Sequence, residues 1–130
     1  ATSDAALVSD TEDVVLNTPT DYGNSYPIGQ CTWGVKEMAP WASNWWGNAN
    51  TWAINAGAQG YATGNVPVPG AIAVWDGGEY GHVAYVTDVQ SDSSIQVLEA
   101  NYNHQKQINN YRGYFNPNEF MGGVTYIYPN

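Results

Sequence analysis

The stretch PGAIAVWDGGEYGHVAYVTDV, residues 69–89, contains two segments that are typical of β-strands. Residues 71–75 and 82–89 are rich in β-branched and aromatic side chains, and a cluster of Gly and Asp separates them. Segments of the same kind follow at 94–102, 107–114 and 124–128. Short strands in succession, separated by turn residues, predict an antiparallel meander.

Two helices are predicted before these strands. The first begins near Cys31 and stops at Pro40, and Gly34 weakens its interior by about 1 kcal/mol relative to Ala. Its apolar side chains lie roughly on one side, and they are Trp33, Val35 and Met38. The sequence therefore predicts a short helix with one apolar side.

The second helix is predicted over residues 51–59, with Asn48 or Asn50 as its N-cap and Gly60 as its left-handed end. The side chains expected to point inward are Trp52, Ile54 and Ala58. Helices followed by an antiparallel sheet predict an α+β fold, with the helices packed on the sheet.

The composition excludes several classes of protein. The chain has 130 residues, 43% hydrophobic and 14% aromatic, which is enough for one packed domain. Its net charge of −9 lacks the basic surface that non-specific nucleic-acid binding requires. The longest apolar run, 71–75, is far short of the ~20 residues that span a membrane. We therefore expect neither a nucleic-acid partner nor membrane insertion.

The acidic residues are unevenly distributed. Residues 1–21 hold five of the twelve Asp and Glu residues and neither Lys nor Arg. Such a segment is typical of a solvated chain without a core of its own. The sequence thus predicts an acidic flexible linker at 1–21 and a globular domain at 22–130.

A hairpin is expected between residues 82 and 102, with its two-residue tip at 92–93. The numbers of facing residues then sum to 185, which puts His82 on the same face as Glu99 and Asn101. In this register Glu99 is too distant from His82 for contact. A two-residue slip or a bulge would place Asn101 opposite His82 and Glu99 within diagonal reach.

Cys31 is the single cysteine, so the chain contains no internal disulfide. Hydrolysis by cysteine needs a thiolate, a base that carries its proton, and a polar group that orients the base. A helix N-terminus favours an anionic sulfur, His82 is the candidate base, and Glu99 or Asn101 would accept its second N–H. The backbone N–H of Cys31 and the side chain of Gln30 would form an oxyanion hole.

Four motifs occur in order along the chain: YPIGQCTW at 26–33, PGAIAVW at 69–75, GHVAYV at 81–86 and VLEANY at 97–102. Together they resemble the CHAP domain, the cysteine, histidine-dependent amidohydrolase/peptidase family. The resemblance covers about residues 22–128 and is closest to secreted cell-wall and cell-separation hydrolases of streptococci and related Gram-positive bacteria. It implies a papain-like α+β fold and cleavage of peptidoglycan amides.

The resemblance also implies roles for individual residues. Cys31 would be the nucleophile, His82 the base, Glu99 the third member that orients the base, and Asn101 a further polar group of the active site. Some phage relatives bind calcium through acidic residues around the cysteine, but Trp33 occupies such a position here. The cysteine and the two histidines also lack the spacing of a zinc site. We therefore expect no metal and no cofactor.

These observations predict a secreted, cell-wall-associated peptidoglycan hydrolase. The sequence does not decide which amide bond is cleaved. Cleavage of a stem-peptide amide would make the protein an endopeptidase, and cleavage of the muramoyl amide would make it an N-acetylmuramoyl-L-alanine amidase. An acidic domain suits an anionic wall poorly, so we also expect a targeting region outside this chain. Residues proposed to flank a glycan–peptide substrate are Trp46, Trp75, Tyr80 and Tyr102.

Two other functions remain compatible with the sequence. A non-catalytic wall-binding or scaffold domain would keep the fold and use its Trp and Tyr surface for recognition. An acyl or peptidyl transferase would use the same cysteine and histidine with an amine in place of water. Rapid, pH-dependent alkylation of Cys31 separates a catalytic thiol from a structural one.

Overall fold

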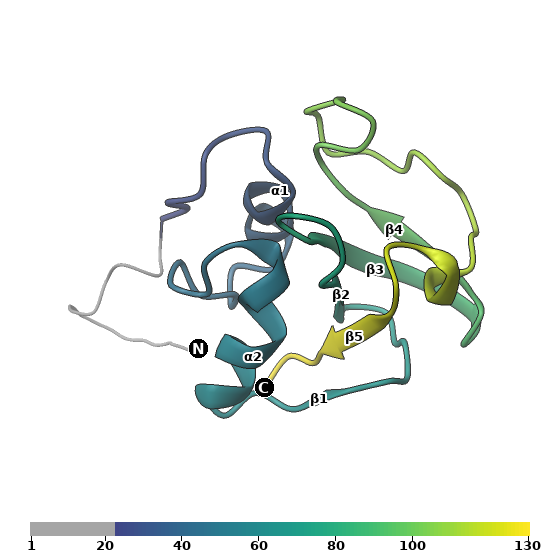
Figure 1. Ribbon diagram of the computed structural model, residues 1–130, viewed down its shortest axis with the longest axis horizontal. Helices are drawn as coiled ribbons and strands as arrows, with labels where there is room; N and C mark the ends of the chain where they lie inside the picture. Colours follow the sequence, from purple (N-terminus) through teal and green to yellow (C-terminus); the bar gives the residue numbers. More distant parts are fainter. Residues whose placement is uncertain (1–22) are drawn as a thin grey trace.

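The sheet of the computed structural model, which describes residues 23–130, has five antiparallel strands in the order β1-β5-β2-β3-β4 (Figure 1). The strands are β1 (Thr63–Gly64), β2 (Ile72–Trp75), β3 (His82–Ser91), β4 (Ser94–Leu98) and β5 (Val124–Ile127). Four of the five predicted strands are confirmed. The predicted acidic linker at 1–21 lies outside the described residues.

Two predictions about the sheet are wrong. The segment 107–114 forms no strand; Asn109 makes an isolated bridge to Glu99, and a second bridge joins Phe115 to Ile95. Its asparagines and Gly113, which has a positive φ of 60°, favour turns over extended pairing. The meander is also limited to β2, β3 and β4, because β5 returns to pair with β2 and the short β1.

The two predicted helices are present as α1 (Cys31–Met38) and α2 (Trp52–Ala58), and the 3-10 turn η2 (Ala49–Thr51) precedes α2. These helices are eight and seven residues long, and none in the described part of the chain is long and apolar enough to cross a membrane. Another 3-10 turn, η3 (Pro117–Glu119), precedes β5.

The inward face of α2 differs from the prediction. Trp52 and Ala56 are buried, whereas Ile54 is 75% exposed and Ala58 is also exposed. Residues four apart share a helix face, but Ile54 is two residues from Trp52 and therefore points about 200° away from it. The other details of this helix are mixed: Gly60 has the expected left-handed φ of 96°, while Asn48 caps η2 without a side-chain hydrogen bond.

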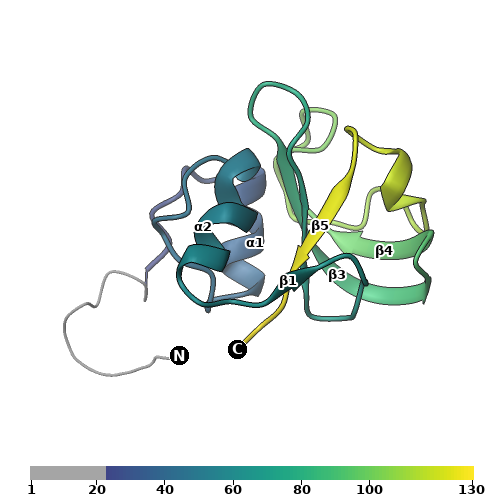
Figure 2. The same cartoon turned by 60° about the horizontal axis from the view of Figure 1, so that its bottom comes forward.

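Apolar residues cover both faces of the sheet. Figure 2 shows α1 and α2 against one face of the sheet, with η3 on the side away from the helices. The cluster on the helix side includes Val35, Trp46, Trp52, Ile72, Val74, Val83 and Ile127. The cluster on the opposite side includes Ala73, Trp75, Ala84, Val86, Ile95, Val97 and Tyr126. This alternation along β2 and β3 is the two-residue period of a strand buried on both faces.

Gly34 decides how closely α1 packs against the chain that follows β4. A Cβ atom at Gly34 would lie 2.9 Å from the Cβ of Ala100, which is closer than packed side chains allow. The missing side chain therefore offsets the helix cost noted above by allowing a close approach. As a result, Cys31 at the start of α1 is held beside the segment 99–101.

Candidate active site

Cys31 is the first residue of α1 and lies at the edge of a pocket of about 560 Å³. Gln30 is the N-cap of this helix, has an extended backbone (φ −78°, ψ 158°), and makes no side-chain cap to the first turn. The backbone N–H groups at this end of the helix favour negative charge on a nearby sulfur. Cys31 is half-buried, so the pocket gives it access to a ligand.

His82 begins β3 and lines the same pocket, although it is only 6% exposed. Gly81 before it has a positive φ of 76°, and a Cβ there would lie 2.6 Å from the backbone N of Asn50 and 2.7 Å from the carbonyl O of Trp75. Glycine therefore permits the tight turn that directs His82 toward the pocket. The structure brings Cys31 and His82 to one site from segments 51 positions apart.

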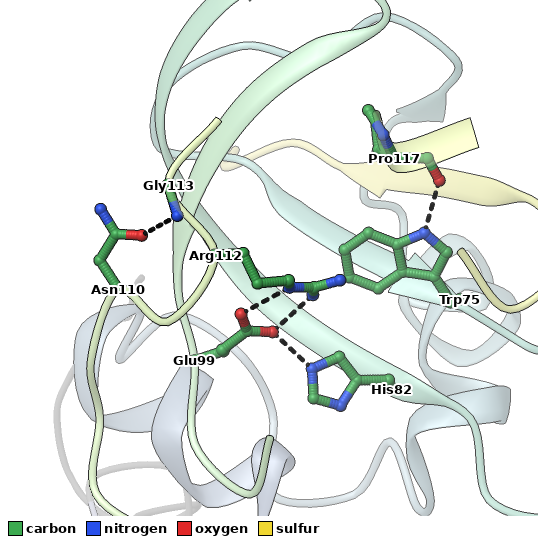
Figure 3. Close-up of polar contacts among 7 residues, drawn as sticks. All are labelled: Trp75, His82, Glu99, Asn110, Arg112, Gly113 and Pro117. Atoms are coloured by element: carbon green, nitrogen blue, oxygen red, sulfur yellow. Dashed lines mark hydrogen bonds and ion pairs between the residues drawn. The ribbon is translucent and has the colours of Figure 1, made fainter. Parts of the chain in front are cut away.

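The two nitrogens of His82 have different partners. Nε2 lies 2.8 Å from Oε1 of Glu99 (Figure 3), which leaves Nδ1 for Cys31, the other side chain that hydrogen-bonds to His82. Burial by itself lowers the pKa of His82, but the hydrogen bonds and charges of Cys31 and Glu99 outweigh it and raise the pKa to about 9. The imidazole is thus held in its protonated form at neutral pH.

Glu99 is completely buried and directly follows β4. Burial alone would raise its pKa, yet the hydrogen bonds and charges of His82 and Arg112 hold the pKa of this carboxyl below its usual range. Arg112 donates to both oxygens, from Nε to Oε2 at 2.9 Å and from a terminal nitrogen to Oε1 at 2.6 Å. The carboxylate is therefore ionised, and the two hydrogen bonds from Arg112 fix the orientation of its plane.

The hairpin register explains how Glu99 reaches His82. Ser91 pairs with Ser94, as the sum of 185 requires, but two irregularities in β3 reduce the sum to 183 at the pair Val86 and Val97. This is the two-residue shift that the sequence left open as the alternative register. It brings Glu99 into contact with His82 and preserves the shared face.

Asn101 lines the pocket without a hydrogen bond to His82. Its Nδ2 donates to Oε1 of Gln30 at 3.2 Å, and its Oδ1 accepts from Nζ of Lys106 at 3.1 Å. Because an ammonium group can only donate, Lys106 fixes which atom of the Asn101 amide is the oxygen. Gln30 then keeps its own NH2 group available for a further acceptor beside Cys31.

The predicted substrate-binding residues divide into two pairs. Trp46 and Trp75 are completely buried, so the prediction that they flank a substrate is wrong. Trp46 donates from Nε1 to Gln59 and Trp75 donates to the carbonyl of Pro117, which shows that both indoles are core side chains with satisfied polar atoms.

The other pair lies at the pocket. Tyr80 is 61% exposed, and Tyr102 is half-buried. Among the described residues that line the pocket, none is Asp, Glu, Lys or Arg. Apart from Cys31 and His82, the wall of the pocket is built from amides, hydroxyl groups and apolar side chains.

Arg112 is a residue of this site that the sequence reasoning missed. It lies in the segment wrongly predicted as a strand, and its spacing from Glu99 fits no motif. A signal did exist, because the chain has only three basic residues and this one is surrounded by aromatic residues at 111, 114 and 115. Within residues 23–130, no group of three or more His, Cys, Asp and Glu side chains is placed to hold a metal ion.

The comparisons with known proteins agree on one family. A family model described as CHAP domain matches residues 21–101. A Streptococcus mutans protein named "Putative hydrolase" is 58% identical over 109 residues, which are 82% of this chain and 52% of the relative. N-acetylmuramoyl-L-alanine amidase sle1 of Staphylococcus aureus is 41% identical over 117 residues, 86% of this chain and 35% of the relative.

Two more matches extend the comparison. Staphylococcal secretory antigen SsaA of Staphylococcus epidermidis is 46% identical over 89 residues, 68% of this chain and 35% of the relative. The crystal structure of an N-acetylmuramoyl-L-alanine amidase from Staphylococcus aureus has a TM-score of 0.65 and 30% identity, and covers 78% of this chain and 30% of that one. The chain thus spans between a third and a half of the curated relatives it matches.

Proposed function

The chain belongs to the CHAP domain family, and from this premise we propose that it hydrolyses an amide bond of bacterial peptidoglycan. The proposed nucleophile is Cys31, with His82 as the acid and base and Glu99 as the group that orients His82. Relatives named N-acetylmuramoyl-L-alanine amidase support this substrate class. The observation that carries the proposal is the meeting of Cys31 and the Glu99-bound His82 at one open pocket.

The first chemical step forms a thioester. The Cys31 thiolate attacks the amide carbonyl, a C–S bond forms, and the carbonyl electrons move onto oxygen. When the tetrahedral intermediate collapses, the C–N bond breaks and the proton of the His82 imidazolium passes to the leaving amine. With its pKa raised to about 9, His82 holds that proton at neutral pH.

The second step regenerates the enzyme. Neutral His82 takes a proton from water as the water oxygen attacks the thioester carbonyl, and the C–S bond breaks. The products are a carboxylic acid and the amine released earlier, so one water molecule is consumed for each amide cleaved. Glu99 accepts from Nε2 throughout, which keeps Nδ1 directed at the reacting atoms.

The proposed oxyanion hole lies beside the sulfur. The backbone N–H of Cys31 at the start of α1 and the side-chain NH2 of Gln30 would donate to the carbonyl oxygen as it gains charge. Asn101 supports this role because its hydrogen bond to Oε1 of Gln30 directs the NH2 group away from itself.

Apart from Cys31 and His82, the described residues that line the pocket are neutral, which fits a substrate rich in amides and hydroxyl groups. Tyr80, which is exposed, and Tyr102 offer ring faces and hydroxyl groups to a glycan–peptide chain. Peptidoglycan lies outside the cell membrane, so this function places the protein outside the cell, as the name of the secretory antigen SsaA also suggests for that relative.

The test is hydrolysis of purified peptidoglycan by the wild type, Cys31→Ala and His82→Ala, followed by mass spectrometry of the released fragments. Free lactyl groups identify a muramoyl amidase, and new amino termini within the stem peptide identify an endopeptidase. We expect either variant to lose at least about a thousandfold in rate. His104→Ala is the matched control, because His104 is exposed and away from the pocket lining.

The alternative of a non-catalytic wall-binding domain makes the opposite prediction. It requires that Cys31→Ala and the wild type release the same, negligible amount of fragments while both sediment with cell walls. That result would end the proposal of an enzyme.

A further inference from the structure

Arg112 lies behind Glu99, on the side away from the pocket. Its side chain is 8% exposed, and it is absent from the described residues that line the pocket. Figure 3 shows the guanidinium group between the Glu99 carboxylate and the Trp75 indole, and His82 bonded to the same carboxylate, at the oxygen Oε1 that also accepts from Arg112. Among its contacts, the two hydrogen bonds to Glu99 link Arg112 to His82, whereas its contacts with Tyr102 and Phe120 reach residues that line the pocket.

Four aromatic rings enclose the guanidinium group. The distances from its central carbon to the ring centroids are 3.9 Å for Phe115, 4.2 Å for Phe120, 4.5 Å for Tyr102 and 5.4 Å for Trp75. These contacts and the two hydrogen bonds to Glu99 offset the cost of removing the cation from water. They also exclude water from the carboxylate, which strengthens its electrostatic interactions.

The backbone near Arg112 is tied to Glu99. Two hydrogen bonds of 3.1 and 3.0 Å join Glu99 and Asn109 in an isolated bridge. The side-chain oxygen of Asn110 then accepts from the backbone N of Gly113 at 2.9 Å and closes the turn that carries Arg112 (Figure 3). The guanidinium thus approaches the carboxylate from a fixed direction.

We propose that Arg112 is a positioning residue, which keeps Glu99 ionised and holds its carboxylate plane so that His82 presents Nδ1 to Cys31. The proposal rests on the proposed function of this site and deepens it. Lysine cannot replace arginine fully here, because an ammonium group lacks the planar fork that engages both oxygens.

The consequence of losing Arg112 follows from burial. The titratable groups that face Glu99 and Arg112 are His82 from β3 and Tyr102 from the loop after β4, with Cys31 of α1 beyond His82. Without the guanidinium, burial dominates and the pKa of Glu99 rises. As the pH falls, Glu99 of the variant becomes protonated at pH values where the wild-type carboxylate is still ionised. The negative charge that stabilises the imidazolium form of His82 is then lost.

The experiment compares Arg112→Gln and Arg112→Lys with the wild type in kcat and KM over pH 4 to 10. For Arg112→Gln we expect kcat to fall by about tenfold to a hundredfold, with KM within about threefold, by analogy with other outer groups that orient a catalytic side chain. The acidic limb of the pH–rate profile of Arg112→Gln should move to higher pH. Arg112→Lys should return the acidic limb toward the wild type while recovering only part of kcat.

A double-mutant cycle with Glu99→Gln supplies the internal control. Because Arg112 acts through Glu99, Arg112→Gln should cost less than about threefold once Glu99→Gln is present. The proposal would be overturned if the losses in kcat of the two single variants multiply in the double variant. It would also be overturned if Arg112→Gln keeps the kcat and the acidic limb of the pH–rate profile of the wild type. If Arg112→Gln does not fold, Arg112→Lys decides alone, and full kcat in that variant overturns the need for the planar fork.

Alkylation of Cys31 by iodoacetamide separates this proposal from the function on which it rests. A wild type that does not cleave peptidoglycan contradicts the function, yet its alkylation rate still reports the Cys31–His82 pair. We expect the acidic limb of the alkylation rate to move to higher pH in Arg112→Gln. An unchanged alkylation profile in a folded Arg112→Gln protein contradicts the role of Arg112 even if the wild type is an active hydrolase.

Discussion

The two sides of the pocket differ in burial and in charge. On one side, the side chains of His82, Glu99 and Arg112 are at most 8% exposed and carry alternating charges in direct contact. On the other side, Cys31 and the amide of Gln30 are half-buried and face a lining without Asp, Glu, Lys or Arg among the described residues. The base side is dry and ionic, whereas the side that holds Cys31 and Gln30 is open, and the described residues of its lining include no Asp, Glu, Lys or Arg.

The difference separates two physical requirements. Orientation of an imidazole needs strong, fixed electrostatic contacts, and these are strongest where aromatic rings exclude water. A substrate carbonyl needs access and neutral N–H donors that are already in place when charge develops on its oxygen. Because α1 and β3 supply the two sides separately, each side meets its own requirement.

The largest expected effect is on the base side. Glu99→Gln removes the charge from a completely buried position and offers His82 an amide that can present the wrong group, so we expect kcat to fall by about a thousandfold. The rate of peptidoglycan hydrolysis measures this loss. Glu119→Gln is the matched control, since Glu119 is exposed in η3, and it should keep the wild-type rate. A loss of only a few fold in Glu99→Gln would show that the ionic side is not needed.

A smaller effect is expected on the thiol side. Gln30→Ala removes one donor of the proposed oxyanion hole and should lower kcat by about a hundredfold, with little change in the pH profile. Steady-state kinetics on soluble muropeptides checks both quantities. Gln105→Ala, an exposed glutamine in the loop after β4, should match the wild type. If Gln30→Ala is equally active, the backbone N–H of Cys31 suffices.

The smallest effect is expected from a change of pH that titrates His82 on the base side. His82 must carry a proton to give to the leaving amine, and its pKa is raised to about 9. The rate should therefore hold up to about pH 9 and then fall about tenfold for each further pH unit. A rate that already falls above about pH 6.5 would contradict the raised pKa, and a profile that stays flat to pH 10 would contradict a value of about 9.

The titration of His82 also changes the stability of the folded state. A raised pKa stabilises the folded state in full below the ordinary value of 6.5, and this contribution is lost as the pH rises through about 9. The Tm of the wild type should fall between pH 7 and pH 10 by more than that of His82→Gln. Equal slopes in the two proteins would contradict the link between His82 ionisation and folding.

Much of the site was predictable because it depends on local patterns. The helix at Cys31, the strand at His82 and the shared face of His82 with Glu99 follow from short-range periodicity and turn residues. The contact between His82 and Glu99 was open, because irregularities in β3 change the register without a clear sign in the sequence. The prediction for Trp75 failed since composition cannot tell a core indole from an exposed one.

By itself, the sequence determined the α+β class, the positions of the nucleophile and base candidates, and the family resemblance, since each depends on residues close together in the chain. Only the tertiary structure decided that Glu99 touches His82, that Asn101 reaches Gln30, and that Arg112 stands behind Glu99. The physical reason is that burial and cross-chain contact depend on how distant segments pack, and a local pattern does not encode that packing.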